Sequence, residues 1–162
     1  MIFEPRAADL DPLDLENALL RAAVGDYADE AAVLLLVNGG HWLPRLQAAD
    51  LITLVLDLDG EGLWAQIDWP ALAPALSAGL LVGSECEEWV LRTAASIADG
   101  SPIDLGDLAA GLDRRTLTLV LAALAHAAGS HDHPAVTPGP GNPSRAVGTL
   151  PPAVAWPSPD WQ

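Results

Sequence analysis

The sequence predicts a mainly α-helical protein: a compact bundle of about five to six helices, with a short β-hairpin at residues 52–68 and an extended C-terminal tail. Half of the 162 residues are hydrophobic (51%), and Ala and Leu, both strong helix formers, dominate them. Aromatic residues, which favour strands, make up only 5%. Asp, Ser and Gly also recur at the spacing of helix starts and ends.

The first predicted helix runs from Pro12 to Val24. Asp11 is a favourable N-cap, and proline is tolerated at the first helical position, where its missing N–H costs nothing. Gly25 ends the helix.

The second predicted helix follows Asp26 and ends at Gly39 and Gly40. It is apolar nearly all round, which is typical of a central helix. The residues concerned are Ala31, Val33, Leu34, Leu35, Leu36 and Val37.

The segment from Leu51 to Gly79 allows two interpretations. Apolar residues alternate on both sides of the turn at 59–62, which favours a hairpin with one half-buried face. Its expected pairs are Leu58 with Leu63, Leu56 with Ala65, and Leu54 with Ile67. The alternative is a helix over residues 48–58, because its leucines also fit helical spacing. Asp68 then caps a helix from Trp69 to Ala78.

Three more helices follow. Ser84 and Glu87 form a capping box, which predicts a helix to about residue 98. Asp104 caps a short helix that ends at Gly111. Asp113 caps a helix to about residue 128, with an apolar stripe of 3.6-residue period. The stripe consists of Leu117, Val120, Leu121, Leu124 and Ala128.

The chain divides into an acidic helical domain (residues 1–129) and a Pro-rich tail (residues 130–162) that should be extended or disordered. Eight of the 14 prolines lie in the tail, and helical periodicity is absent. Trp156 and Trp161 are unusual there. We expect them either to fold back onto the body or to form a short partner-binding motif.

The charge balance limits the partners. The chain carries 22 acidic residues and seven arginines, with a formal net charge of −15. This argues against direct binding to nucleic acid or to anionic membranes, both of which require clustered cations. An acidic nucleic-acid mimic that inhibits a DNA-binding enzyme is one alternative. Without a signal peptide or an apolar run of membrane-spanning length, we expect a cytoplasmic protein.

Two groups of residues are candidate cation ligands. Asp57, Asp59, Glu61, Gly62 and Asp68 occupy the first, third, fifth, sixth and twelfth positions of a calcium loop of the EF-hand kind. Glu at the fifth position and Asp at the twelfth depart from that pattern, so an acidic hairpin turn is the competing interpretation.

The second candidate is the histidine group of His126, His131 and His133, with Asp132 between the last two. Imidazoles at short spacing bind zinc, nickel or copper. His126 lies on a predicted helix and the others follow its glycine end, so the sequence does not establish that they converge.

The sequence contains no catalytic triad motif, phosphate-binding loop or HExxH motif. Cys86 is surrounded by glutamates that disfavour a thiolate, and we expect it to be inert. We expect His41 to follow the end of a helix and to pack on the core. We therefore predict a protein without enzymatic activity and without a cofactor.

Several segments resemble small, uncharacterised helical proteins of high-GC actinobacteria. The resemblance covers roughly residues 11–129, and its clearest stretches are 26–33, 40–43, 67–69, 91–98 and 112–115. It implies a shared helical body and a cytoplasmic setting, with association with mobile elements as one option. It implies no activity, cofactor or catalytic residue.

The leading hypothesis is therefore a protein-interaction or adaptor module that binds another protein. A divalent-cation-binding protein and the nucleic-acid mimic are the alternatives. The oligomeric state is left open.

Overall fold

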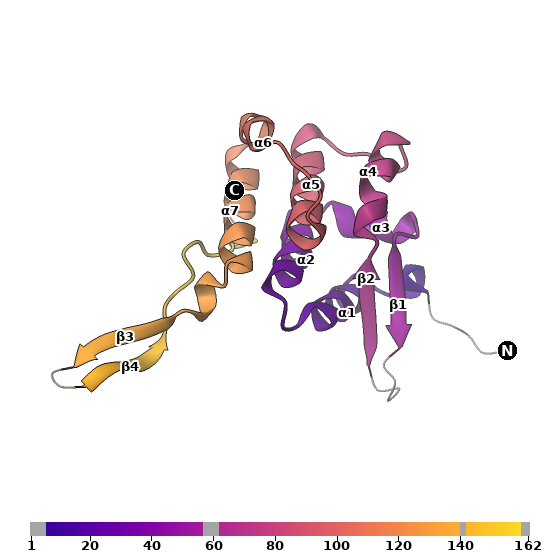
Figure 1. Cartoon of the computed structure of the whole chain (residues 1–162). Coiled ribbons are helices and arrows are strands. Elements are labelled where there is room, and N and C mark those ends of the chain that lie inside the picture. The colour runs from indigo at the N-terminus through magenta and orange to yellow at the C-terminus, as the bar shows by residue number, and fades with distance from the viewer. Residues whose placement is uncertain (1–5, 57–61, 140–141, 160–162) are drawn as a thin grey trace.

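The computed structural model describes residues 6–56, 62–139 and 142–159. In these residues the fold is mainly α-helical, as predicted, and contains two small two-stranded antiparallel sheets (Figure 1). The helices are α1 (Pro12–Ala23), α2 (Tyr27–Gly39), α3 (Trp42–Ala48), α4 (Trp69–Ser77), α5 (Glu85–Asp99), α6 (Leu105–Gly111) and α7 (Arg114–Ala127). The strands are β1 (Ile52–Leu56), β2 (Leu63–Ile67), β3 (Pro134–Gly139) and β4 (Asn142–Thr149). None of the helices described is both long enough and apolar enough to cross a membrane.

Helix α2 is central, as its all-round apolar sequence predicted. It packs against α5 and α7 and also contacts α1 and α3. Ala31, Ala32, Leu35 and Leu36 are fully buried. The helix ends where Gly40 adopts a left-handed conformation, with φ of 73°.

The predicted N-caps are confirmed. In each case a side-chain oxygen accepts a hydrogen bond from a backbone N–H of the first turn and so satisfies a group that has no intrahelical partner. The capping residues are Asp11, Asp26, Asp68, Ser84, Asp104 and Asp113.

Helix α3 was not predicted. It starts after His41, whose side chain makes no capping hydrogen bond, so the usual sequence signal is missing. Trp42 anchors the helix: its side chain is 1% exposed and its indole Nε1 donates to the Glu87 carbonyl at 2.6 Å. His41 therefore follows the end of α2, as expected, and it also occupies the N-cap position of α3.

The first hairpin forms, and the helical alternative for residues 48–58 is wrong. The predicted register is wrong by two residues, because Leu54 pairs with Ala65 and Ile52 pairs with Ile67. A shift of two residues leaves the same side chains on the same face, so the alternating pattern could not distinguish the two registers. Ile52, Ala65 and Ile67 are all buried.

Of the stripe predicted on α7, Val120 is buried, but the three leucines are not. Leu117, Leu121 and Leu124 are 42%, 44% and 47% exposed. The buried residues include Ala122 and Ala123, which are both fully buried. The buried face also includes Thr116 and Leu119, and α7 packs mainly against α2.

The tail contains a second hairpin that was not predicted. A short 3₁₀ helix, η2 (Ser130–Asp132), leads into β3 and β4, which project away from the bundle (Figure 1). Prolines are tolerated because each strand of a two-stranded sheet has a free edge. The chain then returns: the Ala153 N–H donates to Ser130 Oγ at 3.2 Å, and Trp156 packs against the core. Trp156 thus folds back, whereas Trp161 lies outside the described residues.

Candidate metal centre

Three metal-ligating side chains from separate elements meet where the tail leaves the bundle. Glu30 lies in the first turn of α2, His126 in the last turn of α7, and His131 in η2. One potential ligand atom from each residue lies within 4.8 Å of the others. The close packing of α7 on α2 brings Glu30 and His126 together, and the turn at Gly129 brings His131 back over them.

The cluster is only partly accessible to solvent. His126 Nε2 donates to Glu30 Oε2 at 3.0 Å, and the two side chains are 15% and 22% exposed. The His131 ring stacks on that of His126, with centroids 4.1 Å apart and planes at 18°. His131 Nδ1 is buried and has no hydrogen-bond partner among the described residues. A buried nitrogen without a partner is costly, and a ligand would remove that cost.

Tyr27 and Asp132 flank the cluster. The Tyr27 hydroxyl donates a hydrogen bond to the Asp132 carboxylate, and this bond raises the pKa of Tyr27 above its ordinary value. The tyrosine ring also packs edge-on against His131, with centroids 4.8 Å apart. These contacts position the 3₁₀ helix that carries His131.

Two imidazoles and a carboxylate are a ligand set that suits zinc and similar divalent transition metals. In the stacked arrangement the lone pairs of the two rings lie in nearly parallel planes. Binding one ion would therefore require the His131 ring to rotate about its side-chain bonds until its lone pair converges with that of His126.

The structure brings together two of the three predicted histidines. His133 is exposed and is not part of the cluster, and its carbonyl accepts from the Leu150 N–H at the base of the second hairpin. Glu30 takes the third place. Local sequence contains no signal for Glu30, since an acidic residue in the first turn of a helix is common and is explained by the helix dipole alone.

The predicted calcium loop falls largely outside the described residues, which do not include Asp57, Asp59 and Glu61. Asp68, its last member, caps α4 by accepting from the Ala71 N–H at 3.3 Å. The partner-binding candidate Trp156 lies beside His126, with ring centroids 6.3 Å apart.

The other two reactive side chains that the sequence singled out have structural partners. Cys86 donates through Sγ to the Gly111 carbonyl at 3.2 Å. His41 pairs through Nδ1 with Glu87 Oε1 at 2.8 Å and packs edge-on against Trp42.

Comparison of the chain with protein-family models, with curated proteins and with solved structures finds no match.

Proposed function

We propose that this protein binds a divalent transition metal, with zinc as the reference ion, through Glu30, His126 and His131. The proposal rests on the proximity of one potential ligand atom from each of these residues, together with the buried His131 Nδ1 that has no hydrogen-bond partner among the described residues. Because the ligands come from α2, α7 and η2, the ion would fasten the start of the C-terminal segment to the helical bundle. Its role would be structural: to hold the projecting hairpin β3–β4 at a fixed orientation.

The test is titration of the full chain with Zn²⁺ after treatment with a chelator, followed by calorimetry. We expect one ion per chain and a midpoint of thermal unfolding that rises with zinc concentration, because a ligand that binds only the folded state stabilises it. His126→Ala and His131→Ala should each abolish this gain. His133→Ala is the matched control, because His133 lies two residues away but outside the cluster, and it should retain zinc binding.

Binding should weaken in acid, since protons compete with the metal for the same nitrogens. The proposal fails if His131→Ala binds zinc as tightly as the unmodified chain, or if His133→Ala loses binding to the same extent.

A second candidate function, association with another protein, is favoured by the exposed stripe of Leu117, Leu121 and Leu124 on α7. The partner that we propose is a second copy of the chain. In an antiparallel pair of α7 helices, Arg114 and Arg115 of each copy would meet the carbonyl end of the other, where a helix dipole favours cations.

Sedimentation velocity over a concentration series tests this second function. We expect a dimer that Leu121→Glu converts to a monomer. Leu13→Glu, at an exposed leucine on α1, is the control and should leave the dimer intact. A chain that stays monomeric at about 100 μM, where even a weak association of micromolar affinity is populated, contradicts the proposal.

A further inference from the structure

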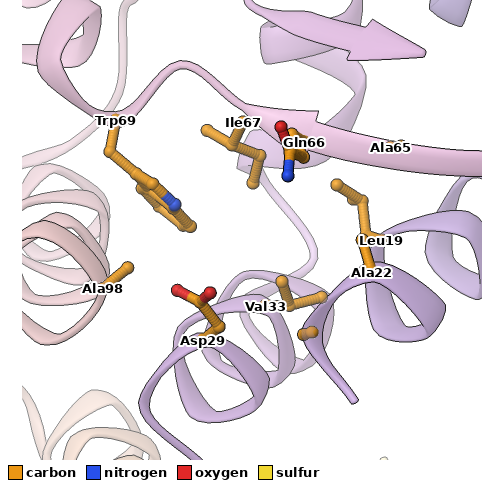
Figure 2. A pocket seen from close by; sticks show the side chains of 10 residues that line it. Leu19, Ala22, Asp29, Val33, Ala65, Gln66, Ile67, Trp69 and Ala98 are labelled. Carbon is orange, nitrogen blue, oxygen red and sulfur yellow. The ribbon is translucent and has the colours of Figure 1, made fainter. Parts of the chain in front are cut away.

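A cavity of about 290 Å³ lies between α1, α2, β2, the start of α4 and the end of α5. Apolar side chains such as Leu19, Val33 and Ile67 form part of its lining, and polar atoms form at least as much of it. Asp29 of α2 is the charged residue among the described residues that line it. Figure 2 shows the Asp29 carboxylate pointing into the space below Trp69 and Ile67, with the Gln66 side chain on the opposite wall.

The Asp29 carboxylate lacks a partner. In the part of the chain that the structure describes, no side chain forms an ion pair with it and no group donates a hydrogen bond to it. Partial burial raises the pKa of the Asp29 carboxyl, and the neighbouring Asp26 raises it further. A partly desolvated carboxylate without a partner is unfavourable unless a cation compensates it.

The other walls define which cation would fit. Metal ions of the hard type need several oxygen ligands, and this cavity offers one carboxylate and one amide. Apolar side chains instead suit alkyl groups, and the Trp69 indole can attract a cation by its π face. An anionic ligand is disfavoured by Asp29 and by the net charge of −15.

From these features we infer that the cavity is a binding site for a small organic ammonium ion. Asp29 supplies the counter-charge, Trp69 contacts the cationic head, and the aliphatic walls cover the alkyl part. Its volume lies at the small end of the usual range for ligand pockets, so the ligand is the size of a methylated or short-chain amine.

Choline is the probe, and 3,3-dimethylbutan-1-ol is its uncharged isostere, with carbon in place of nitrogen. Binding to the full chain is measured by calorimetry and by shifts of the backbone amides of Asp29 and Gln66 in NMR spectra. A chelator is present, so the histidine cluster cannot contribute through a bound metal. We expect choline to bind at least about tenfold more tightly than the isostere, since a desolvated cation–π contact alone contributes about that factor.

Asp29→Asn should weaken choline binding by about tenfold or more, as expected for the loss of one partly buried charge pair. Asp107→Asn is the matched control. Like Asp29, Asp107 is the third residue of its helix and donates its backbone N–H to the side chain of an Asp N-cap. Unlike Asp29, Asp107 is exposed and does not line the cavity. Trp69→Phe, which keeps an aromatic ring, should weaken binding less than Asp29→Asn does.

Equal affinity for choline and its isostere would overturn the inference, because recognition would then be of shape alone. So would unchanged binding in Asp29→Asn, or amide shifts that fall outside the cavity. No choline binding at about 10 mM, where even a weak small-molecule site would be occupied, would also overturn it.

Discussion

His126 and Glu30 lie 96 positions apart in the sequence, yet the imidazole Nε2 is 3.0 Å from the carboxylate Oε2. This contact joins α7 to α2 at the point where the C-terminal segment leaves the bundle. It links the central helix of the fold to the proposed metal centre.

Glu30 and His126 should be energetically coupled even without metal. Because both side chains are largely buried, removing either one leaves the other without its partner. A double-mutant cycle of Glu30→Ala and His126→Ala, measured by urea unfolding with a chelator present, should give a coupling of about 0.5–1.5 kcal/mol. Additive effects of the two substitutions would show that the contact does not contribute to stability.

Tyr27 should ionise at a higher pH than a free tyrosine. The hydrogen bond to Asp132 stabilises the neutral hydroxyl and raises the pKa of Tyr27. Tyr27 is the single tyrosine of the chain, so absorbance during an alkaline titration reports on it alone. Asp132→Asn should move the midpoint toward the ordinary value near 10.0. Because the pKa of Tyr27 is higher in the folded chain than in the unfolded chain, the hydrogen bond to Asp132 stabilises the fold at pH values below the unfolded pKa. This stabilisation is lost as the pH rises through the folded pKa. An unchanged midpoint in Asp132→Asn would contradict the contact.

Glu87 should make stability depend on acid pH. Its carboxylate accepts from the Ser84 N–H at 2.7 Å, which lowers the pKa of Glu87, and the ion pair with His41 lowers it further. Because the pKa of Glu87 is lower in the folded chain than the ordinary value of 4.5, the ionised carboxylate stabilises the fold at pH values above 4.5. This stabilisation is lost as the pH falls through the pKa of the folded state. Glu87→Gln should therefore be less stable than the parent at pH 7, and the difference should shrink below pH 4.5 in urea unfolding at several pH values. A difference that stays constant with pH would show that the charge is unimportant.

Gly83 should tolerate no side chain while Trp42 is present. A Cβ at position 83 would lie 2.8 Å from Cζ2 of the buried Trp42 indole. Gly83→Ala should cost about 1–3 kcal/mol of unfolding free energy through overpacking. The cost should be smaller in a Trp42→Phe background, where the ring is shorter. Gly39→Ala is the control, because its nearest neighbour, Val90 Cγ1, would be at an ordinary 3.5 Å. Equal costs in the two backgrounds would exclude the ring as the cause.

Trp156 should hold the returning C-terminal segment against the bundle. It packs on the core and lies beside His126. Trp156→Ala should increase amide hydrogen exchange at residues 150–159, because opening of this segment would no longer expose a large apolar side chain. Exchange in α2 should be unchanged and serves as the internal reference. Unaltered exchange at residues 150–159 would mean that the indole does not anchor the segment.

Much of this fold follows from local sequence. Asp11, Asp26, Ser84, Asp104 and Asp113 each begin a helix, because an N-cap is a contact between a side chain and a backbone group two or three residues away. The same local chemistry explains why α3 was missed, since His41 makes no capping bond. The hairpin face also followed from alternation, whereas its register did not, because a shift of two residues preserves that alternation.

The sequence by itself determined the helix starts, the apolar character of α2, the acidic surface and the presence of histidines near the end of α7. Only the tertiary structure decided which face of α7 is buried, that Glu30 joins His126 and His131 while His133 stays outside, and that Trp156 returns to the core. The physical reason is the distance along the chain over which each interaction acts. Capping and periodicity act within one or two turns of a helix, whereas these choices depend on how closely α7 approaches α2 and on contacts between residues far apart in the chain.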